Sequence, residues 1–410
     1  MNRSWTTRFL CGLGLITLAL AMPTPATAGS AEGFIYGRVT TDDGDVHEGR
    51  LRWSDEEAFW GDFFDSTKER EDRPYLEKVP EDQRRRGTPI KIFGLTVGTS
   101  YGHSGSARML KIRFGDIAEL HPRGGDRATM VLKDGSRFEL DGGSNDLGAT
   151  IHVSGAEQGD VEIEWGDIES IEFSPVPAAL DVGQHRLHGT VVTAVGEFSG
   201  FIQWDKDECV SSDKLDGESD DGDHELEMGS IRSIERASYR GSLVTLRDGT
   251  ELLLEGTNDV NDDNRGIFVD DPRFGRLLVS WDAFERIDFS DPGPSGPAYG
   301  DYKPGRPLHG TVTDVDGALH RGRIVYDLDE SATWEFLDGE SDDIAYSVPM
   351  GLVSSIEPRK DGSLVILKSG EKLDLEGTAD VDEGNDGIAI LDGDKVGYVA
   401  WDRVRRVDFE

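Results

Sequence analysis

The stretch GSLVTLRDGTELLLEGTNDV at residues 241–260 returns as GSLVILKSGEKLDLEGTADV at 362–381, and more loosely as ATMVLKDGSRFELDGGSNDL at 128–147. In each copy, apolar and polar residues alternate on both sides of a short turn. The turn pairs, such as Asp248-Gly249, suit tight two-residue connections. Because alternation with a period of two is typical of half-buried strands, each copy predicts a β-hairpin.

A longer period surrounds these hairpins. The run LHGTVVT at 187–193 returns as LHGTVT at 308–313, a spacing of 121 residues between positions 188 and 309. Pro- and Gly-rich stretches at 174–186 and 290–307 have the composition of linkers. We therefore expect three tandem repeats. They are unit 1 (29–176, with an insertion near 68–107), unit 2 (187–290) and unit 3 (308–410).

A finer pattern divides each unit into two halves, because three apolar residues spaced three apart recur six times. These triplets are Phe114, Ile117, Leu120; Trp165, Ile168, Ile171; Met228, Ile231, Ile234; Trp281, Phe284, Ile287; Met350, Val353, Ile356; and Trp401, Val404, Val407. A spacing of three between strand-like runs predicts a single 3₁₀ turn joining two strands. Each half then consists of a hairpin, a polar loop, a strand, a 3₁₀ turn and a final strand.

This order resembles the small five-stranded β-barrels of the Sm-like and Src-homology type, in which a 3₁₀ turn precedes the last strand. The resemblance covers nearly the whole chain after residue 28. It implies an all-β fold in which each unit holds two small barrel halves, and it implies no activity, because a shared layout does not carry a function. Two halves that share one larger sandwich or barrel are the alternative.

The first 28 residues have the features of a secretion signal. Arg3 and Arg8 precede an apolar run at 9–22, and small residues follow at 26–28. We therefore expect export, to the periplasm or to the cell exterior. Cys209 is the only cysteine after residue 28, so packing rather than an intrachain disulfide must stabilise the exported chain.

Charge and hydropathy exclude several classes of partner. The chain has 81 acidic and 43 basic residues, a formal net charge of −38. Such a surface repels nucleic-acid phosphates, so we expect no nucleic acid as partner. The apolar run at 9–22 is shorter than the roughly 20 residues that a membrane-spanning helix needs, and no later segment is more apolar. The sequence therefore predicts no membrane span.

Acidic loops are the most repeated polar feature of the chain. Dense carboxylates suit Ca²⁺, which takes about six to eight oxygen ligands from flexible loops. One candidate set follows the first hairpin of units 2 and 3 and comprises Asp216, Glu218, Asp220, Asp338, Glu340 and Asp342. A second set partly matches an EF-hand loop and comprises Asp259, Asn261 and Asp263. The competing interpretation is a solvated, Asx-stabilised turn in which Asp146, Asp259 and Asp380 share one structural role.

Two tryptophans lie outside the period-two pattern. Most aromatic residues end predicted strands and should fill the cores. Trp60 and Trp334 fall within the loops instead, so we expect them to be exposed contacts for a protein or glycan partner.

No sequence motif for catalysis is present: there is no HExxH helix, Walker loop or GxSxG elbow. The sequence therefore predicts a non-enzymatic, exported binding or scaffolding module that acts on an envelope or extracellular protein or glycan. The alternative is a Ca²⁺-dependent module that binds glycan or protein. A hydrolase that uses scattered carboxylates is the third hypothesis.

Overall fold

The computed structural model describes residues 31–54, 56–68, 88–92, 95–100, 108–142, 146–155, 159–178, 180, 182–290, 294–393 and 395–410. The predicted secretion signal lies outside these residues. Regular structure in the described ranges consists of β-strands and short 3₁₀ turns, with no α-helix among them. The all-β class is therefore confirmed.

The described residues of unit 1 form twelve strands, and two of them lie in the expected insertion. The strands are β1 (Tyr36–Thr41), β2 (Val46–Trp53), β3 (Phe63–Lys68), β4 (Thr88–Ile92), β5 (Leu95–Ser100), β6 (Arg108–Arg113), β7 (Ile117–Pro122), β8 (Arg127–Leu132), β9 (Arg137–Asp141), β10 (Ile151–Gly155), β11 (Gly159–Ile163) and β12 (Ile168–Phe173). The insertion strands β4 and β5 pair only with each other, as a separate two-stranded sheet.

Units 2 and 3 each hold ten strands. Those of unit 2 are β13 (His188–Thr193), β14 (Gly196–Gln203), β15 (Lys214–Ser219), β16 (Gly222–Glu227), β17 (Ile231–Arg236), β18 (Gly241–Leu246), β19 (Glu251–Glu255), β20 (Ile267–Asp271), β21 (Gly275–Val279) and β22 (Phe284–Phe289). Those of unit 3 are β23 (His309–Asp314), β24 (Leu319–Val325), β25 (Phe336–Ser341), β26 (Ile344–Pro349), β27 (Val353–Pro358), β28 (Ser363–Leu367), β29 (Lys372–Leu375), β30 (Ile388–Asp392), β31 (Lys395–Val399) and β32 (Val404–Phe409).

Short 3₁₀ turns precede most of the strands that end a half. They are η4 (Phe114–Asp116), η5 (Trp165–Asp167), η6 (Met228–Ser230), η8 (Met350–Leu352) and η9 (Trp401–Arg403), with η1 (Ala31–Gly33) and η7 (Tyr299–Asp301) elsewhere. The predicted 3₁₀ turn is thus confirmed for five of the six apolar triplets. The remaining triplet, which begins at Trp281, has an ordinary turn in place of the 3₁₀ turn.

The strand order within the sheets is the same in the three units. In unit 2 it is β21-β20-β14-β13-β22-β17-β18-β19-β15-β16, and the unit 1 strands follow the corresponding order from β11 to β6. Unit 3 follows it from β31 to β29, and a backbone bridge between Glu340 and Glu376 then joins β25 to β29. We call two residues equivalent when they hold the same place in this order.

The expected barrel halves are wrong: no sheet among the described residues closes into a barrel. The reason is that the two sequence halves of a unit exchange strands. The last strand of the first half, β17, pairs with β18 of the second half, and the last strand of the second half, β22, pairs with β13. Because β17 and β22 also pair with each other, the halves merge into one open sheet.

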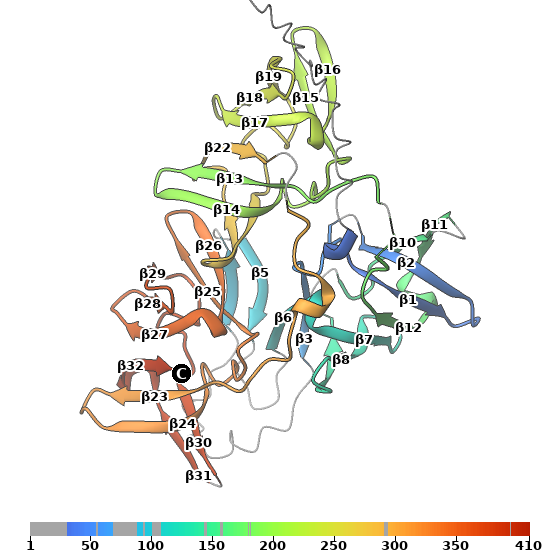
Figure 1. Cartoon of the computed structure of the whole chain (residues 1–410). Helices are drawn as coiled ribbons and strands as arrows, with labels where there is room; N and C mark the ends of the chain where they lie inside the picture. The colour runs from blue at the N-terminus through green and yellow to red at the C-terminus, as the bar shows by residue number, and fades with distance from the viewer. Residues whose placement is uncertain are drawn as a thin grey trace, which may run out of the picture.

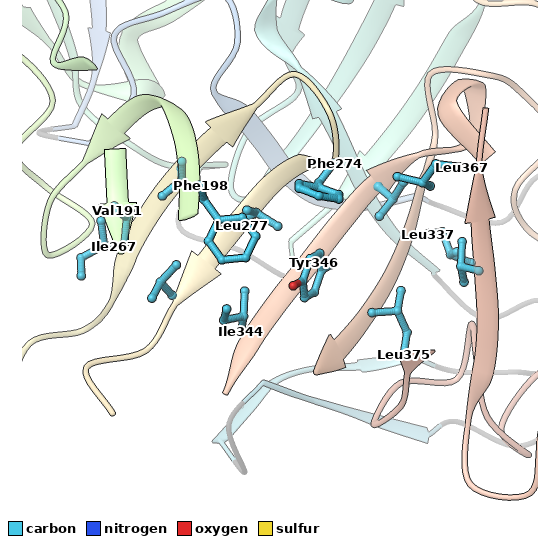
Figure 2. Close-up of a cluster of buried hydrophobic side chains, with 14 of the residues drawn as sticks. Val191, Phe198, Ile267, Phe274, Leu277, Leu337, Ile344, Tyr346, Leu367 and Leu375 are labelled. Atoms are coloured by element: carbon cyan, nitrogen blue, oxygen red, sulfur yellow. The ribbon is translucent and has the colours of Figure 1, made fainter. Parts of the chain in front are cut away.

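The cores of units 2 and 3 are continuous. One buried hydrophobic cluster runs from Leu187 to Val407, whereas unit 1 has its own cluster from Ile35 to Phe173. Figure 2 shows the joint, where Leu277 on β21 and Tyr346 on β26 lie side by side. Here β26 of unit 3 adds to the edge of β21 of unit 2 in antiparallel register. The linker that precedes unit 3 therefore does not separate the two cores.

No helix in the described ranges is long and apolar enough to cross a membrane.

Candidate binding surface

A carboxylate closes the loop after the second strand of every unit. In unit 1, one Asp62 oxygen accepts hydrogen bonds from the backbone N–H groups of Ala58 (3.0 Å) and Phe59 (2.8 Å). Asp213 in unit 2 and Glu335 in unit 3 accept the equivalent pairs of bonds. These acids therefore satisfy backbone donors that the loop would otherwise leave unpaired.

Asp146, Asp259 and Asp380 have one structural role in the three units. The Asp259 backbone oxygen accepts from Trp204 Nε1 at 2.9 Å, and its carboxylate accepts from the backbone N–H of Asp216 at 2.7 Å. Asp146 receives the equivalent bonds from Trp53 and Asp65, and Asp380 receives them from Tyr326 and Asp338. These three aspartates therefore hold the loop after β19, and its equivalents in units 1 and 3, against the second and third strands of each unit.

The loop that resembles an EF-hand is held by Asx turns. Asn261 Oδ1 accepts from the backbone N–H of Asp263 at 2.8 Å, and Asn264 Oδ1 accepts from that of Gly266 at 3.0 Å. Asp259 is buried, while Asp263 is exposed. In the described part of the chain, no three acidic, histidine or cysteine side chains group together as a metal site requires.

A buried carboxyl lies beside each of these aspartates. Burial, and after it the neighbouring charge of Asp259, raises the pKa of Glu208 to about 9; burial also raises the pKa of Asp259, to about 6. At the equivalent positions Glu57 and Glu330 have pKa values well above the usual range for the same reason. These carboxyls hold protons near neutral pH because desolvation penalises the ionised form.

Hairpins β3–β6 and β25–β26 pack against each other with equivalent residues in contact. The rings of Phe63 and Phe336 are equivalent, and their centroids lie 4.6 Å apart. Beside them, Lys111 Nζ donates to both carboxylate oxygens of Asp338, each at 2.9 Å, and to Ser347 Oγ at 3.0 Å. Although burial by itself lowers the pKa of Lys111, the charges of Asp338 and Asp65 raise it overall. Units 1 and 3 therefore cover each other's hairpin face with a lysine–aspartate pair and an aromatic pair.

The equivalent face of unit 2 lies on β15–β16, at the upper end of the molecule in Figure 1, far from β25–β26. We call this surface the unit 2 hairpin face; its residues are Lys214, Asp216, Glu218, Asp223, Glu225 and Glu227. All six are exposed. Within the face, Lys214 forms an ion pair with Glu227 at 3.2 Å, with 40% and 63% of the two side chains exposed. Five carboxylates therefore face solvent where units 1 and 3 have a covered surface.

The structure spreads the predicted acidic residues over several environments. Asp216 and Glu218 belong to the unit 2 hairpin face, and Asp220 is exposed in the turn beyond it. Their unit 3 counterparts differ. Asp338 is bonded to Lys111, Glu340 is half-buried beside β29, and Asp342 is exposed in a turn with a φ of 53°.

The expectation that Trp60 and Trp334 are exposed contacts is wrong for Trp60. Its side chain is completely buried, and its ring packs against Tyr299 of the linker at 290–307, with centroids 4.5 Å apart. Trp334 is half-buried and packs against the core of unit 1, near Phe138. Both rings therefore pack within contacts of unit 1, Trp60 in the contact with the linker at 290–307 and Trp334 in the contact with unit 3.

A buried charge network joins units 1 and 2. Arg186 and Arg276 each donate to Asp62 Oδ1 at 3.1 Å, and Arg186 also donates to Asp270 at 2.7 Å. The two arginine side chains are 5% and 6% exposed, so the ions are almost wholly desolvated. Aromatic rings enclose each guanidinium: Phe59 and Phe201 around Arg186, and Phe63 and Phe268 around Arg276.

The contact between units 1 and 2 is reciprocal. Arg52 donates to Asp213 and to the backbone oxygen of Asp207, while the equivalent Gln203 donates to the backbone oxygen of Glu56. Since Asp207 and Glu56 are themselves equivalent, the two units face each other through the same surface. Sequence reasoning missed this network, because the two arginines that Asp62 binds do not recur in the other units.

Searches against protein-family models, curated proteins and solved structures found no match to this chain.

Proposed function

We propose that this protein is an exported, non-enzymatic binding or scaffolding module, which acts in the periplasm or at the cell exterior. Its binding surface is the unit 2 hairpin face, and its partner is a basic protein surface. A single observation carries the proposal. Three equivalent hairpin faces exist, two of them cover each other, and the third is exposed and acidic.

The contact between units 1 and 3 indicates what such a partner must provide. There, Asp338 holds Lys111 and the adjoining ring of Phe336 lies 5.2 Å below the guanidinium of Arg113. Asp216 is equivalent to Asp338, and Glu225 lies opposite it on β16. A lysine or arginine placed over this pair gains charge-assisted hydrogen bonds, and electrostatic steering favours its approach.

An aromatic ring in the partner has a defined place. Lys214 is equivalent to Phe63 and Phe336, so the unit 2 hairpin face has a cation where the other two faces have a ring. A partner ring over Lys214 would form a cation–π contact worth about 0.5–1 kcal/mol at an exposed site. The proposed partner surface therefore combines basic residues with at least one aromatic residue.

The test uses a defined probe, a synthetic β-hairpin peptide that carries two lysines and one phenylalanine on one face. Isothermal titration should show binding to the full chain and no binding of a control peptide with glutamates in place of the lysines. The variant D216N/E218Q/E225Q should lose most of the affinity. The matched control E169Q/E285Q/D402N removes the same number of exposed charges elsewhere and should retain it. If both variants lost the same amount of affinity, binding would depend on net charge alone, and the proposed surface would be rejected.

A further inference from the structure

The first strand of the sheet order is an edge position that differs among the units. It is β11 in unit 1, β21 in unit 2 and β31 in unit 3. In unit 2 this edge is covered, because β26 pairs with it from Arg276 opposite Ser347 to Val279 opposite Ile344. All five residues of β21 are buried as a result. In the sheets as described, β11 and β31 are end strands.

The two open edges have different chemistry. On β11, Asp160 and Glu162 are exposed, and charged side chains of this kind protect an edge from pairing with another strand. On β31 the equivalent residues are Val396 and Tyr398, and the segment from Val396 to Val399 contains no charge. The edge of β31 therefore has the composition of a covered strand and lacks the protection of β11.

The backbone of β31 is arranged for pairing. On β21, Arg276 and Leu278 lie opposite residues of β26. The β31 residues equivalent to Arg276 and Leu278 are Val396 and Tyr398. Hairpin geometry agrees, because Asp392 and Lys395 are the closing pair of the β30–β31 ladder, and the closing pair of a tight hairpin is hydrogen-bonded. Alternation along the antiparallel ladder then points the N–H and C=O groups of Val396 and Tyr398 away from β30.

An apolar patch adjoins this edge. Val325, Leu328 and Ala389 form a small buried cluster separate from the main core of units 2 and 3, with Leu391 and Tyr398 half-buried against it. Tyr398 also donates its hydroxyl to the backbone oxygen of Asp386 at 2.8 Å, which fixes the ring over the patch.

We propose that β31 pairs with β31 of a second copy of this chain, antiparallel and centred on Gly397. In this register Val396 lies opposite Tyr398 of the other copy, and their outward backbone groups form the hydrogen-bonded pairs. Gly397 meets its own counterpart, so no side chains clash at the centre. The arrangement is self-complementary, as a two-fold interface requires.

A second copy's β31 fits this edge better than its β16. Strand β16 is the unit 2 equivalent of β26, so it is the other candidate to add to β31. It carries Asp223, Glu225 and Glu227, all exposed, and the β21–β26 register would place Glu225 and Asp223 opposite Val396 and Tyr398. Apolar residues beside carboxylates make a poor cross-strand match, whereas valine beside tyrosine makes a good one.

The dimer should be weak and should strengthen with salt. One short strand pair buries less than the roughly 1,200 Å² typical of stable complexes, so we expect a reversible dimer. Each copy has a formal net charge of −38, and added salt screens the repulsion between copies. Binding of a basic partner by the unit 2 hairpin face should instead weaken with salt, so the two associations are distinguishable.

Sedimentation velocity of the full chain over a concentration series tests the pairing. The weight-average sedimentation coefficient should rise with concentration, and more steeply at higher NaCl. V396D copies the charge of β11, and V396P removes an N–H that points away from β30, on the side where the described sheet ends. Both variants should remain monomeric. The control D160P makes the same change on β11 and should leave the association intact. Association that persists in both Val396 variants would overturn the proposal, as would its absence from the unaltered chain.

A cysteine at the two-fold centre tests the register. Cα atoms of a non-hydrogen-bonded antiparallel pair lie about 4.5 Å apart, within the range that a disulfide bridges. G397C should therefore form a disulfide-linked dimer under mild oxidation, while V161C, at the equivalent position of β11, should not. Cross-linking of both variants to the same extent would indicate random collision and would contradict the proposed pairing.

Discussion

Phe63 and Phe336 occupy equivalent positions in units 1 and 3, and their ring centroids lie 4.6 Å apart. Units 1 and 3 therefore contact each other through equivalent faces. Unit 2 has Lys214 at this position, on a hairpin surrounded by carboxylates. Because a like face would repel it, this hairpin suits a basic partner rather than another copy of itself.

Replacing Asp62 by alanine should destabilise the chain strongly. Asp62 is the shared partner of Arg186 and Arg276, and its loss removes a negative charge that two buried cations need. Breaking a buried pair in this way costs about 3–5 kcal/mol. The control D213A removes the equivalent loop-closing carboxylate, but its partner Arg52 is 29% exposed and can be hydrated, so the loss should be smaller. Urea unfolding measures both; equal losses would show that only the loop bonds matter.

Stability should fall as the pH rises from about 5 to about 9. The pKa of Glu208 is raised to about 9 in the folded chain, while the unfolded chain releases this proton near the ordinary glutamate value. The folded state therefore binds more protons throughout this window, and rising pH favours unfolding. Urea midpoints at a series of pH values should decline less steeply in E208Q than in the unaltered chain. An unchanged slope in E208Q, with the exposed E251Q as control, would count against a buried proton at Glu208.

Gly275→Ala should weaken the joint between units 2 and 3. Gly275 has a φ of 95°, and a Cβ there would meet the backbone oxygen of Ser347 on β26 at 2.4 Å. Gly249 has a similar φ of 92° with nothing within 4 Å, so G249A incurs the backbone strain alone. We expect G275A to lose more thermal stability than G249A and to be cleaved faster near residues 290–307 by a protease. Equal behaviour of the two variants would mean that the β21–β26 contact does not limit stability.

Calcium should have no effect beyond its ionic strength. Sodium chloride should raise the melting temperature, since salt screens the repulsion among 81 acidic residues. The Asx turns of the 259–266 loop are bonded to backbone groups, and we expect CaCl₂ at matched ionic strength to give the same rise. A clearly larger rise with CaCl₂ would favour the Ca²⁺-dependent alternative.

Local patterns predicted the elements of this fold well. Period-two alternation located the hairpin β18–β19, and the spacing of three located turns such as η6, because both patterns depend on neighbours in sequence. Pairing between halves could not be predicted in this way. Whether β22 pairs with β13 of its own unit or with another strand depends on packing that no local pattern encodes.

The candidate surface was predicted only in part. Asp216 and Glu218 were singled out as acids, but as metal ligands rather than as part of a hairpin face. Trp60 was expected at the surface because it lies outside the strand pattern, yet the linker residue Tyr299 covers it. A long-range contact of this kind leaves no periodic signal in the sequence. The cationic position of Lys214 among equivalent phenylalanines is the one sequence signal that comparison of the units could have used.

Hydrogen–deuterium exchange on the full chain, with and without the lysine–phenylalanine hairpin peptide, tests the central claim most directly. Amide exchange is slowed where a partner covers or stabilises backbone, so bound peptide marks its own site. The account predicts slower exchange across residues 214–227 of β15–β16, with no change at β31 and none in D216N/E218Q/E225Q. Protection elsewhere in the chain, or unchanged exchange at 214–227 under conditions in which the peptide binds, would contradict the assignment of the unit 2 hairpin face.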